Sequence, residues 1–394
     1  MKAEGGAESK SAGQHQGAAM KKGWQTKQLG ELCRFIDYRG KTPEKTASGL
    51  RLITAKNVKM GYLQENPMEF VAPESYDSWM TRGIPKMGDV LFTTEAPLAN
   101  VAQLDTDEKV VFAQRIIVLQ PAANNLDRTF LKYLLLSDVA QDRILEQGTG
   151  ATVQGIKASL LKTIPIEFPP LAEQQRIVGL LDEAFEGLAT AKANAEKNLQ
   201  NARALFESHL RSVFTQRGPG WVEKNLGDLC QIKTGKKDVN EGNPDGKYPF
   251  FTCAAAHTFS DNYSFDTEAL LVAGNGNVGQ VSYYSGKFEA YQRTYVLFDF
   301  KGVTAKYLFR VLDKRLSATV SKQKLGNTMP YIKIGMLTDF VVPVPPPKEQ
   351  ELVAESLRAI SEETQNLARL YEQKLVALDA LKKSLLHQAF AGEL

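Results

Sequence analysis

The sequence FPPLAEQQRIVGLLDEAF at residues 168–185 marks a change from one kind of structure to another. Paired prolines cannot continue a sheet or lie inside a helix, so they predict a domain boundary. Beyond them, residues 172–215 contain no proline, and apolar side chains recur at alternating spacings of three and four. A spacing kept over such a length predicts a long helix with a narrow apolar seam.

The same arrangement occurs a second time. VPPPKEQELVAESLRAI at residues 344–360 again places prolines before a Glu-Gln pair, and the proline-free segment 348–390 has the same apolar spacing. Helices of about 42 residues would each be roughly 60 Å long. An exposed apolar stripe of that length would be insoluble, so each helix needs a partner, and its counterpart is the obvious one. We therefore expect an antiparallel coiled coil. The alternative, in which each helix packs flat on its own domain, stays open at this point.

The chain in front of each helix is also repeated. GWQTKQLGELC at residues 23–33 matches GWVEKNLGDLC at residues 220–230. A further match lies closer to the prolines, where Ile156, Lys157 and Leu161 correspond to Ile332, Lys333 and Leu337. The two sets of matches have different offsets, so the interiors of the copies differ in length. One scaffold is used twice, with two different inserts and an expected pseudo-twofold relation.

Short β-type runs punctuated by Gly, Pro, Asn and Asp fill the segments before the helices, for example at residues 115–119 and 294–298. Short helices are expected at residues 129–144 and 305–316. The fold class is therefore α+β, with two mixed α/β domains and two long antiparallel helices. The expected boundaries are a disordered leader at 1–22, a first domain at 23–168, a first spacer helix at 169–219, a second domain at 220–343 and a second spacer helix at 344–394.

Length and composition exclude several classes of protein. The chain has 394 residues, 43% of them hydrophobic and 24% charged, with a net charge of +3, which predicts two or three folded domains. No apolar run reaches the roughly 18 residues of a spanning helix, and no signal peptide is evident, so we expect a cytoplasmic protein without membrane contact. The three cysteines and four histidines form no metal-ligand spacing, which predicts buried reduced thiols and no metal site.

One motif resembles a nucleotide-binding loop. GNGNVG at residues 274–279 fits G-x-G-x-x-G, but the adjoining QVSYY at residues 280–284 has the character of a strand. A dinucleotide fingerprint must open a helix, so we expect a turn between two strands instead.

Recognised catalytic motifs are absent from the sequence. It contains no Walker A motif, no G-x-S-x-G and no paired-histidine helix, and NPMEF at residues 66–70 departs from the N/D-P-P-Y/F tetrapeptide of amino-methyltransferases. We therefore expect a binding or scaffolding protein and not an enzyme.

Basic loops interleaved with hydrogen-bonding side chains are the candidates for nucleic-acid contact. Arginine reads guanine, asparagine and glutamine read adenine, and lysine neutralises phosphate. Both domains place a Gln-Arg pair at the head of a strand-like run. The candidates are Arg39, Lys41, Lys56, Asn57, Gln114 and Arg115 in the first domain, and Lys236, Lys237, Asn275, Asn277, Gln292, Arg293, Lys322 and Lys324 in the second. For each of them, ordinary solvated surface charge is the alternative.

The motifs that recur in order are those of a known family. They are Gly150-Ala151-Thr152, Ile164-Pro165-Ile166 and Pro169-Pro170 in the first copy, Gly326-Asn327-Thr328 and Pro345-Pro346-Pro347 in the second, and the closing Ala389-Phe390-x-Gly392-Glu393-Leu394. With the repeat and the helices, they make the chain closely resemble the specificity subunits of type I restriction-modification systems.

The resemblance implies a function. Each domain would be a target recognition domain that reads one half of a bipartite, asymmetric site in double-stranded DNA, and the helices would form the spacer. The subunit would catalyse nothing and bind no cofactor. Two modification methyltransferase subunits would bind S-adenosylmethionine, and restriction subunits would use ATP and Mg. A coiled-coil scaffold with two peptide-binding domains and an autonomous DNA methyltransferase are the rival interpretations.

Overall fold

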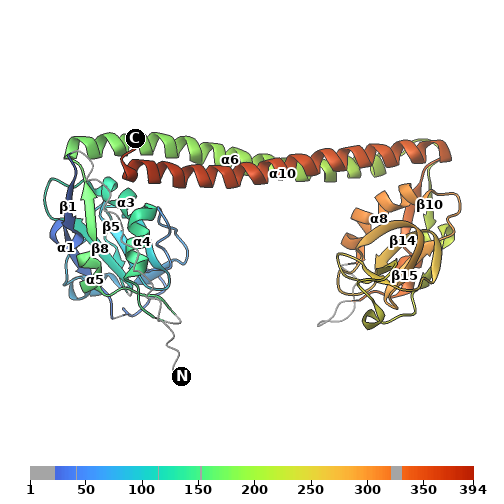
Figure 1. The fold of residues 1–394 in the computed structure, drawn as a ribbon, viewed down its shortest axis with the longest axis horizontal. Coiled ribbons are helices and arrows are strands. Elements are labelled where there is room, and N and C mark those ends of the chain that lie inside the picture. Colours follow the sequence, from blue (N-terminus) through green and yellow to red (C-terminus); the bar gives the residue numbers. More distant parts are fainter. Residues whose placement is uncertain (1–22, 41, 114, 151–152, 321–330) are drawn as a thin grey trace, which may run out of the picture. The chain divides into compact units, whose positions relative to one another are not determined.

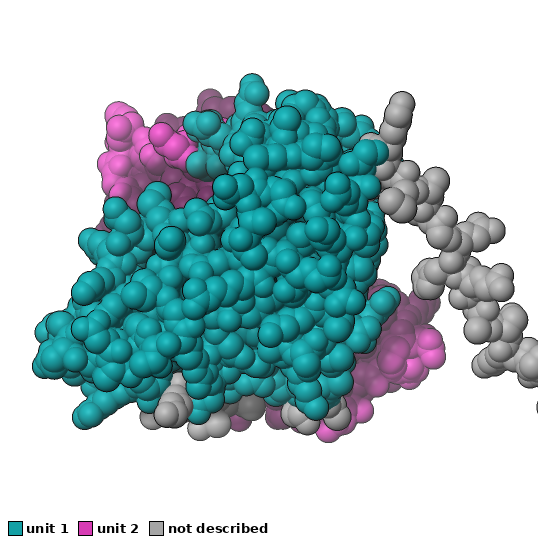
Figure 2. Space-filling view, turned by 90° about the vertical axis from the view of Figure 1, so that its left-hand side faces the viewer, with its two compact units in different colours: residues 1–194, 375–394 teal, residues 195–374 magenta. Residues whose placement is uncertain are grey.

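The computed structural model describes residues 23–40, 42–113, 115–150, 153–320 and 331–394 (Figure 1). The expected leader and four of the DNA-contact candidates, Lys41, Gln114, Lys322 and Lys324, lie outside these ranges. The chain divides into two compact units, coloured separately in Figure 2. The first contains the residues up to Asn194 together with Leu375–Leu394, and the second contains Ala195–Lys374. Each unit therefore holds one mixed α/β domain and part of both long helices.

The first unit is built on a four-stranded antiparallel sheet in the order β2-β8-β5-β6. Its strands are β2 (Cys33–Asp37), β5 (Val90–Thr94), β6 (Leu98–Gln103) and β8 (Ile116–Pro121). A smaller sheet contains β3 (Leu50–Ile53), β4 (Glu69–Val71) and β7 (Val111–Phe112), and a two-stranded one pairs β1 (Gln25–Gln28) with β9 (Pro165–Phe168). The helical elements are α1 (Leu29–Leu32), the short 3-10 helix η1 (Pro73–Ser75), α2 (Tyr76–Trp79), α3 (Arg128–Leu136), α4 (Asp138–Glu146) and α5 (Ala158–Thr163). Helix α3 packs on β5 and β6, and α4 packs on β6.

The helix expected at residues 129–144 is two helices. Buried Ser137 ends α3 in an extended conformation, and its hydroxyl accepts a hydrogen bond from the N–H of Ala140 to cap α4. Serine favours this capping position because its side chain replaces a missing backbone partner. The apolar spacing continues through the break, which is why periodicity alone joined the two helices.

The second unit is built on a six-stranded sheet in the order β11-β16-β14-β15-β12-β13. Its strands are β11 (Gln231–Thr234), β12 (Tyr248–Phe251), β13 (Thr258–Ser260), β14 (Phe265–Ala273), β15 (Val281–Ala290) and β16 (Thr294–Phe298). A separate pair joins β10 (Val222–Asn225) to β17 (Val341–Val344). The helical elements are α7 (Leu226–Leu229), the 3-10 helix η2 (Val239–Glu241), α8 (Ala305–Val320) and α9 (Ile334–Thr338). The helix expected at residues 305–316 is confirmed as α8, and the strand-like runs at 115–119 and 294–298 correspond to β8 and β16.

The repeat in the sequence is also a repeat of backbone contacts. The N–H of Leu29 donates to the carbonyl of Ile164 at 2.9 Å, and the N–H of Leu226 donates to the carbonyl of Phe340 at 2.9 Å. Strand β1 pairs with β9 in the first unit as β10 pairs with β17 in the second. The same scaffold therefore occurs in both units, although Ile164-Pro165 of one copy is Phe340-Val341 in the other.

Two helices of 45 residues each, α6 (Leu171–Thr215) and α10 (Pro347–Ala391), follow the proline segments. They run antiparallel within each unit (Figure 1). Lys192 pairs with Asp379 at 2.9 Å in the first unit, and Arg203 pairs with Glu372 at 2.8 Å in the second. The expected coiled coil is thus confirmed, and the alternative of helices packed only on their own domains is wrong.

Each domain core includes the start of one long helix and the end of the other. In the first unit Ile177 and Leu181 of α6 share a core with Leu386 and Phe390 of α10. In the second unit Leu210 and Phe214 of α6 share a core with Ala354 and Leu357 of α10.

One buried glutamine in each copy joins helix to domain. The side chain of Gln174 donates to the carbonyls of Asn125 and Pro169 and accepts from the N–H of Asp127. Gln350 makes the matching bonds to Gly302, Pro345 and Thr304 in the second unit. The amide of each glutamine thus satisfies buried backbone groups, which gives a physical reason for a glutamine at this position in both copies.

The three cysteines are buried and unpaired with one another, as expected. Among the described residues, none of the helices combines the length and the apolar character that crossing a membrane requires.

Candidate nucleic-acid interface

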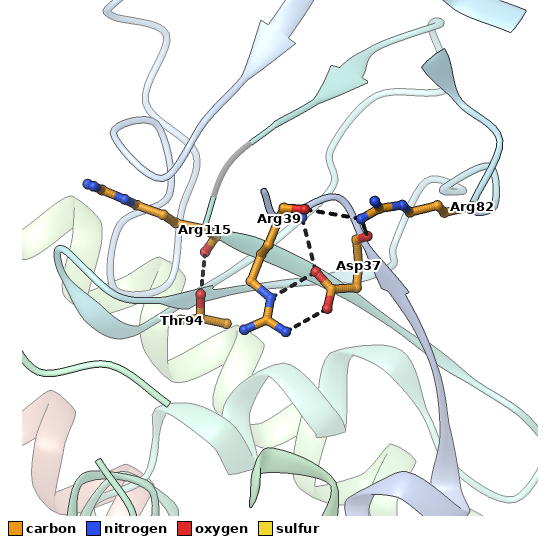
Figure 3. A network of polar contacts seen from close by, with 5 residues as sticks. All are labelled: Asp37, Arg39, Arg82, Thr94 and Arg115. Atoms are coloured by element: carbon orange, nitrogen blue, oxygen red, sulfur yellow. Dashed lines mark hydrogen bonds and ion pairs between the residues drawn. The ribbon is translucent and has the colours of Figure 1, made fainter. Parts of the chain in front are cut away.

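In the first unit, several of the predicted residues meet where the main sheet ends. Arg39 follows β2, Arg115 directly precedes β8, and Glu95 directly follows β5. These three side chains and Lys157 line one open cavity. Strand ends that are neighbours in the sheet therefore bring together residues that are far apart in the sequence (Figure 3).

Arg39 is held by Asp37, the last residue of the preceding strand β2. Its Nε donates to Oδ1 of Asp37 at 2.8 Å and its Nη2 to Oδ2 at 2.7 Å (Figure 3). Burial raises the pKa of Asp37, but the hydrogen bonds from Arg39 outweigh it, and the pKa of this carboxyl lies below its usual value. Nη1 of Arg82 donates to the carbonyl of Arg39 at 3.1 Å. The turn after β2 is therefore fixed, with Arg39 presented at the cavity.

Arg115 has an unusual backbone. Its φ is 70°, in the left-handed region, which is costly for a residue with a side chain and is found most often at functional sites. Its carbonyl accepts the N–H of Thr94 at 2.8 Å, and its Nε lies 3.0 Å from Oε1 of Glu95. The side chain is 47% exposed, and Figure 3 shows its guanidinium extending away from the Arg39–Asp37 pair.

Arg115 also lines a second cavity, with Lys45, Lys56 and Glu69. Lys56 is exposed, and Lys45 pairs with Glu69 at 2.7 Å. Arg115 thus lies between two hollows that both carry cations. A surface of this kind can contact phosphates along a duplex while carboxylates between the cations limit nonspecific attraction.

Asn57 must be removed from the candidates. It is 1% exposed, its Oδ1 accepts from the backbone N–H and the hydroxyl of Thr54, and its Nδ2 donates to the carbonyls of Gln64, Glu65 and Pro67. The side chain holds the surrounding loop and has no face toward solvent. Its sequence neighbour Lys56 is exposed, so the dipeptide gave no indication of which residue points outward.

In the second unit, Arg293 directly precedes β16, and its carbonyl accepts the N–H of Gly274 at 2.9 Å. Gln292 and Arg293 are exposed, with Nε2 of Gln292 donating to Oδ2 of Asp238 at 3.2 Å. Arg115 and Arg293 therefore both stand directly before a strand, whereas Gln114 lies outside the described residues.

The two lysines after β11 differ in their surroundings. Lys236 is exposed. Lys237 is half-buried, and its Nζ lies 3.2 Å from Oγ of Ser260 and 3.8 Å from the fully buried carboxylate of Glu289. Because a buried carboxylate needs a compensating charge, Lys237 has a structural role.

The glycine-rich segment is a turn between strands, as expected. Strands β14 and β15 are antiparallel neighbours, and the N–H of Gly279 closes the turn on the carbonyl of Ala273 at 2.9 Å. No helix begins there, so the dinucleotide interpretation is excluded. Asn277 is exposed and Asn275 is half-buried.

Sequence reasoning missed three cations near these residues. Lys157 and Lys333 are both exposed, and each follows an isoleucine whose N–H bonds to a strand end of the main sheet. The sequence did contain a signal for these two lysines, because both belong to the repeated motif, but that motif was used only to align the two copies. Arg82 had no comparable signal.

Comparisons with known proteins point in one direction. A family model described as "Type I restriction modification DNA specificity domain" matches residues 21–199 and 219–373. The EcoDI specificity subunit of a type I restriction enzyme from Escherichia coli is 37% identical over 174 residues, which are 44% of this chain and 38% of that protein. The MjaVIII specificity subunit of Methanocaldococcus jannaschii is 21% identical over 334 residues, 75% of this chain and 77% of that protein. The match to the EcoDI protein thus spans well under half of that protein's length.

Solved structures have the same fold. A chain of a type I R-M system superposes with a TM-score of 0.75 at 21% identity and covers 96% of this chain and 100% of its own length. The HsdS subunit of Thermoanaerobacter tengcongensis gives a TM-score of 0.63 at 20% identity and covers 96% of this chain and 99% of its own length.

Proposed function

Since this chain belongs to the family of the type I restriction modification DNA specificity domain, we propose that it recognises a bipartite, asymmetric site in double-stranded DNA, with one half-site for each unit. The observation that carries the proposal is the common placement of Arg115 and Arg293. Each precedes the strand that lies between the first and third strands of its main sheet, and each side chain is exposed. In each unit an exposed lysine of the repeated motif follows an isoleucine whose N–H bonds to the neighbouring strand end. Arginine and lysine at exposed strand ends are suited to bases and phosphates.

The long helices would set the number of unread base pairs between the half-sites. At 45 residues and about 1.5 Å per residue, each is roughly 67 Å long, which exceeds one DNA turn of about 34 Å. The buried seam makes the pair stiff, so a change of its length would have to be matched by a change of the DNA site.

The helices also carry a surface suited to partner subunits. Large apolar side chains are exposed along them, at Leu180 and Leu205 of α6 and at Leu352, Leu370 and Val376 of α10. Such exposure on a long helix favours a protein partner. The partners proposed are two modification methyltransferase subunits, which would hold S-adenosylmethionine, and restriction subunits, which would use ATP and Mg. This chain would itself catalyse nothing and bind no cofactor.

The test is a binding selection. The full chain, assembled with its modification subunits, is incubated with a pool of randomised duplex DNA, and the bound sequences are read. We expect two short specified blocks separated by a fixed unspecified gap. Exchange of residues 23–168 for those of another such subunit should change one block only.

Three results would contradict the proposal. If both blocks changed on the exchange, the units would not be independent readers. An affinity that hardly falls with added salt would favour the peptide-binding scaffold, because phosphate contacts release counterions. Methyl transfer by the isolated chain would support the autonomous methyltransferase.

A further inference from the structure

We infer that two kinds of position share the candidate interface: Arg115, Arg293, Lys157 and Lys333 hold DNA phosphates, whereas Glu95 and Asn275 select the base. The inference rests on the proposed function and assigns the roles within it. The two units have the same backbone hydrogen bonds at these positions, where some side chains are the same in both units and others differ.

The equivalence of the arginines is established by backbone hydrogen bonds. The N–H of Thr94, at the end of β5, donates to the carbonyl of Arg115 at 2.8 Å. The N–H of Gly274, directly after β14, donates to the carbonyl of Arg293 at 2.9 Å. The strands agree, since Thr93 pairs with Ile116 and Ala273 pairs with Thr294. Arg115 and Arg293 therefore occupy the same place in the two sheets.

The lysines are equivalent by the same reasoning. The N–H of Ile156 donates to the carbonyl of Thr94 at 2.9 Å, and the N–H of Ile332 donates to the carbonyl of Gly274 at 3.0 Å. Both isoleucines are buried, and the lysine after each is exposed. Lys157 and Lys333 are thus held beside corresponding strand ends, each in its own unit.

Glu95 and Asn275 share a third position. Glu95 forms an isolated antiparallel bridge with Gly155, and Asn275 forms one with Tyr331. Each lies one residue after the residue whose N–H donates to the carbonyl of the arginine. The backbone position is therefore the same in both units, while the side chain differs. The bridge partners differ as well. A Cβ on Gly155 would lie 3.2 Å from Cβ of Glu95 and 3.3 Å from the carbonyl oxygen of Thr94, whereas the second unit has a tyrosine in that place.

The four cations are of the same type at matching positions in both units. If the two units read different half-sites, residues that are the same in both units cannot account for the difference. Lysine is a flexible point charge suited to phosphate, and contacts to phosphate fix the register of a protein on the duplex without reading it. The four cations therefore position the DNA.

The position that differs has the chemistry of base reading. A carboxylate accepts a hydrogen bond from the N4 amino group of cytosine, and asparagine makes two hydrogen bonds to adenine. Glu95 is 46% exposed in its side chain and lines the cavity with Arg115 and Lys157. Its Oε1 lies 3.0 Å from Nε of Arg115, so the carboxylate is paired with one of the positioning cations.

The experiment uses the full chain assembled with its modification subunits. A duplex is chosen by selection from a randomised pool, and affinity is then measured by fluorescence anisotropy for that duplex and for each of its single-base-pair variants, at several salt concentrations. The positioning variants are Lys157→Ala and Lys333→Ala. The matched control is Lys301→Ala, an exposed lysine beyond the far end of β16 from Arg293. The variants that test base selection are Glu95→Asn and Asn275→Glu. Glu95→Gln is added because it keeps the shape of the glutamate side chain.

We expect Lys157→Ala and Lys333→Ala to weaken binding to every duplex by a similar factor and to reduce the salt slope by about one, while Lys301→Ala leaves both unchanged. We expect Glu95→Asn and Glu95→Gln to change the preferred base within one half-site by roughly fivefold or more and to leave the other half-site as it was, with Asn275→Glu acting on the opposite half-site.

A lysine variant that altered the preference at one base pair, or glutamate variants that lowered the affinity for all duplexes equally, would overturn the inference. Failure of the unsubstituted assembly to select any sequence would instead overturn the proposed function itself.

Discussion

The ring of Phe390, on α10, lies edge-on against the ring of Phe130, on α3, with 5.3 Å between their centroids. Phe390 is 3% exposed and belongs to the core of the first unit. The helix that comes after the second domain in the sequence therefore completes the first domain in space.

Removing this ring should loosen the first unit. We expect Phe390→Ala to lower the free energy of unfolding of that unit by about 3–5 kcal/mol, because a buried aromatic ring is replaced by a cavity. The repeat supplies the matched control: Phe214, 7% exposed and facing Trp221, is the counterpart in the second unit, and Phe214→Ala should loosen that unit instead. Hydrogen exchange measured by mass spectrometry separates the two. Faster exchange of the second unit in Phe390→Ala would contradict the assignment.

The buried amide of Gln174 should be as important to stability as an apolar core residue. Gln174→Ala would leave the carbonyls of Asn125 and Pro169 and the N–H of Asp127 without their partner. Each unsatisfied buried group costs about 1–3 kcal/mol, so we expect a loss of at least about 2 kcal/mol in urea unfolding. Gln175→Ala, at the exposed neighbouring position on the same helix, should change stability by less than about 0.5 kcal/mol. Equal effects of the two substitutions would disprove the linking role.

The Asp37–Arg39 pair should make the first unit sensitive to acid. Since the pKa of Asp37 is lowered in the folded chain, its stabilising effect is present above the unfolded pKa of about 3.9 and is lost as the pH falls through the lower folded value. We expect Asp37→Asn to cost up to about 1 kcal/mol near pH 7, with the difference from the unsubstituted chain vanishing near pH 2. Urea unfolding over this pH range measures it. A difference that grew toward acid pH would have the wrong sign.

The thiols of Cys33 and Cys230 should be inert in the folded chain. Burial raises the pKa of each to about 12, with the charge of Asp89 adding to the effect at Cys33. Because only the thiolate reacts, we expect no carbamidomethylation of either residue by iodoacetamide at pH 8 until urea unfolds the unit that contains it. Mass spectrometry of the peptides gives the result, and rapid labelling without urea would show that these sites open.

Lengthening the two long helices should test the gap between the half-sites separately from the recognition of each half-site. One heptad inserted after Asn194 in α6 and one after Lys374 in α10 keeps the apolar seam and adds about 10 Å, the rise of roughly three base pairs. We expect each unit to unfold as before, but affinity for the original DNA site should fall at least about a hundredfold, toward nonspecific binding. Anisotropy titration checks this. Unchanged affinity would show that the helices do not set the gap.

Local patterns were sufficient for much of the architecture. The prolines at 169–170, the heptad spacing beyond them and the repeated GW…LG…LC motif identified two domains and two long helices, because each signal is complete within a short window. The turn at residues 274–279 was also accessible, since residues 280–284 have the alternation of a strand. Ser137 was missed because its cap interrupts a helix without interrupting the apolar spacing.

Three features could be established from the order of residues alone: one scaffold is used twice, each copy ends in a long amphipathic helix, and cations stand before corresponding strands. Three others needed the folded chain, namely that α10 completes the first domain, that Asn57 is buried while Lys56 is exposed, and that Glu95 and Asn275 are counterparts. The difference lies in the range of the interactions. Helix periodicity and turn chemistry act between near neighbours, whereas strand register, burial and core membership depend on contacts between residues that the chain keeps far apart.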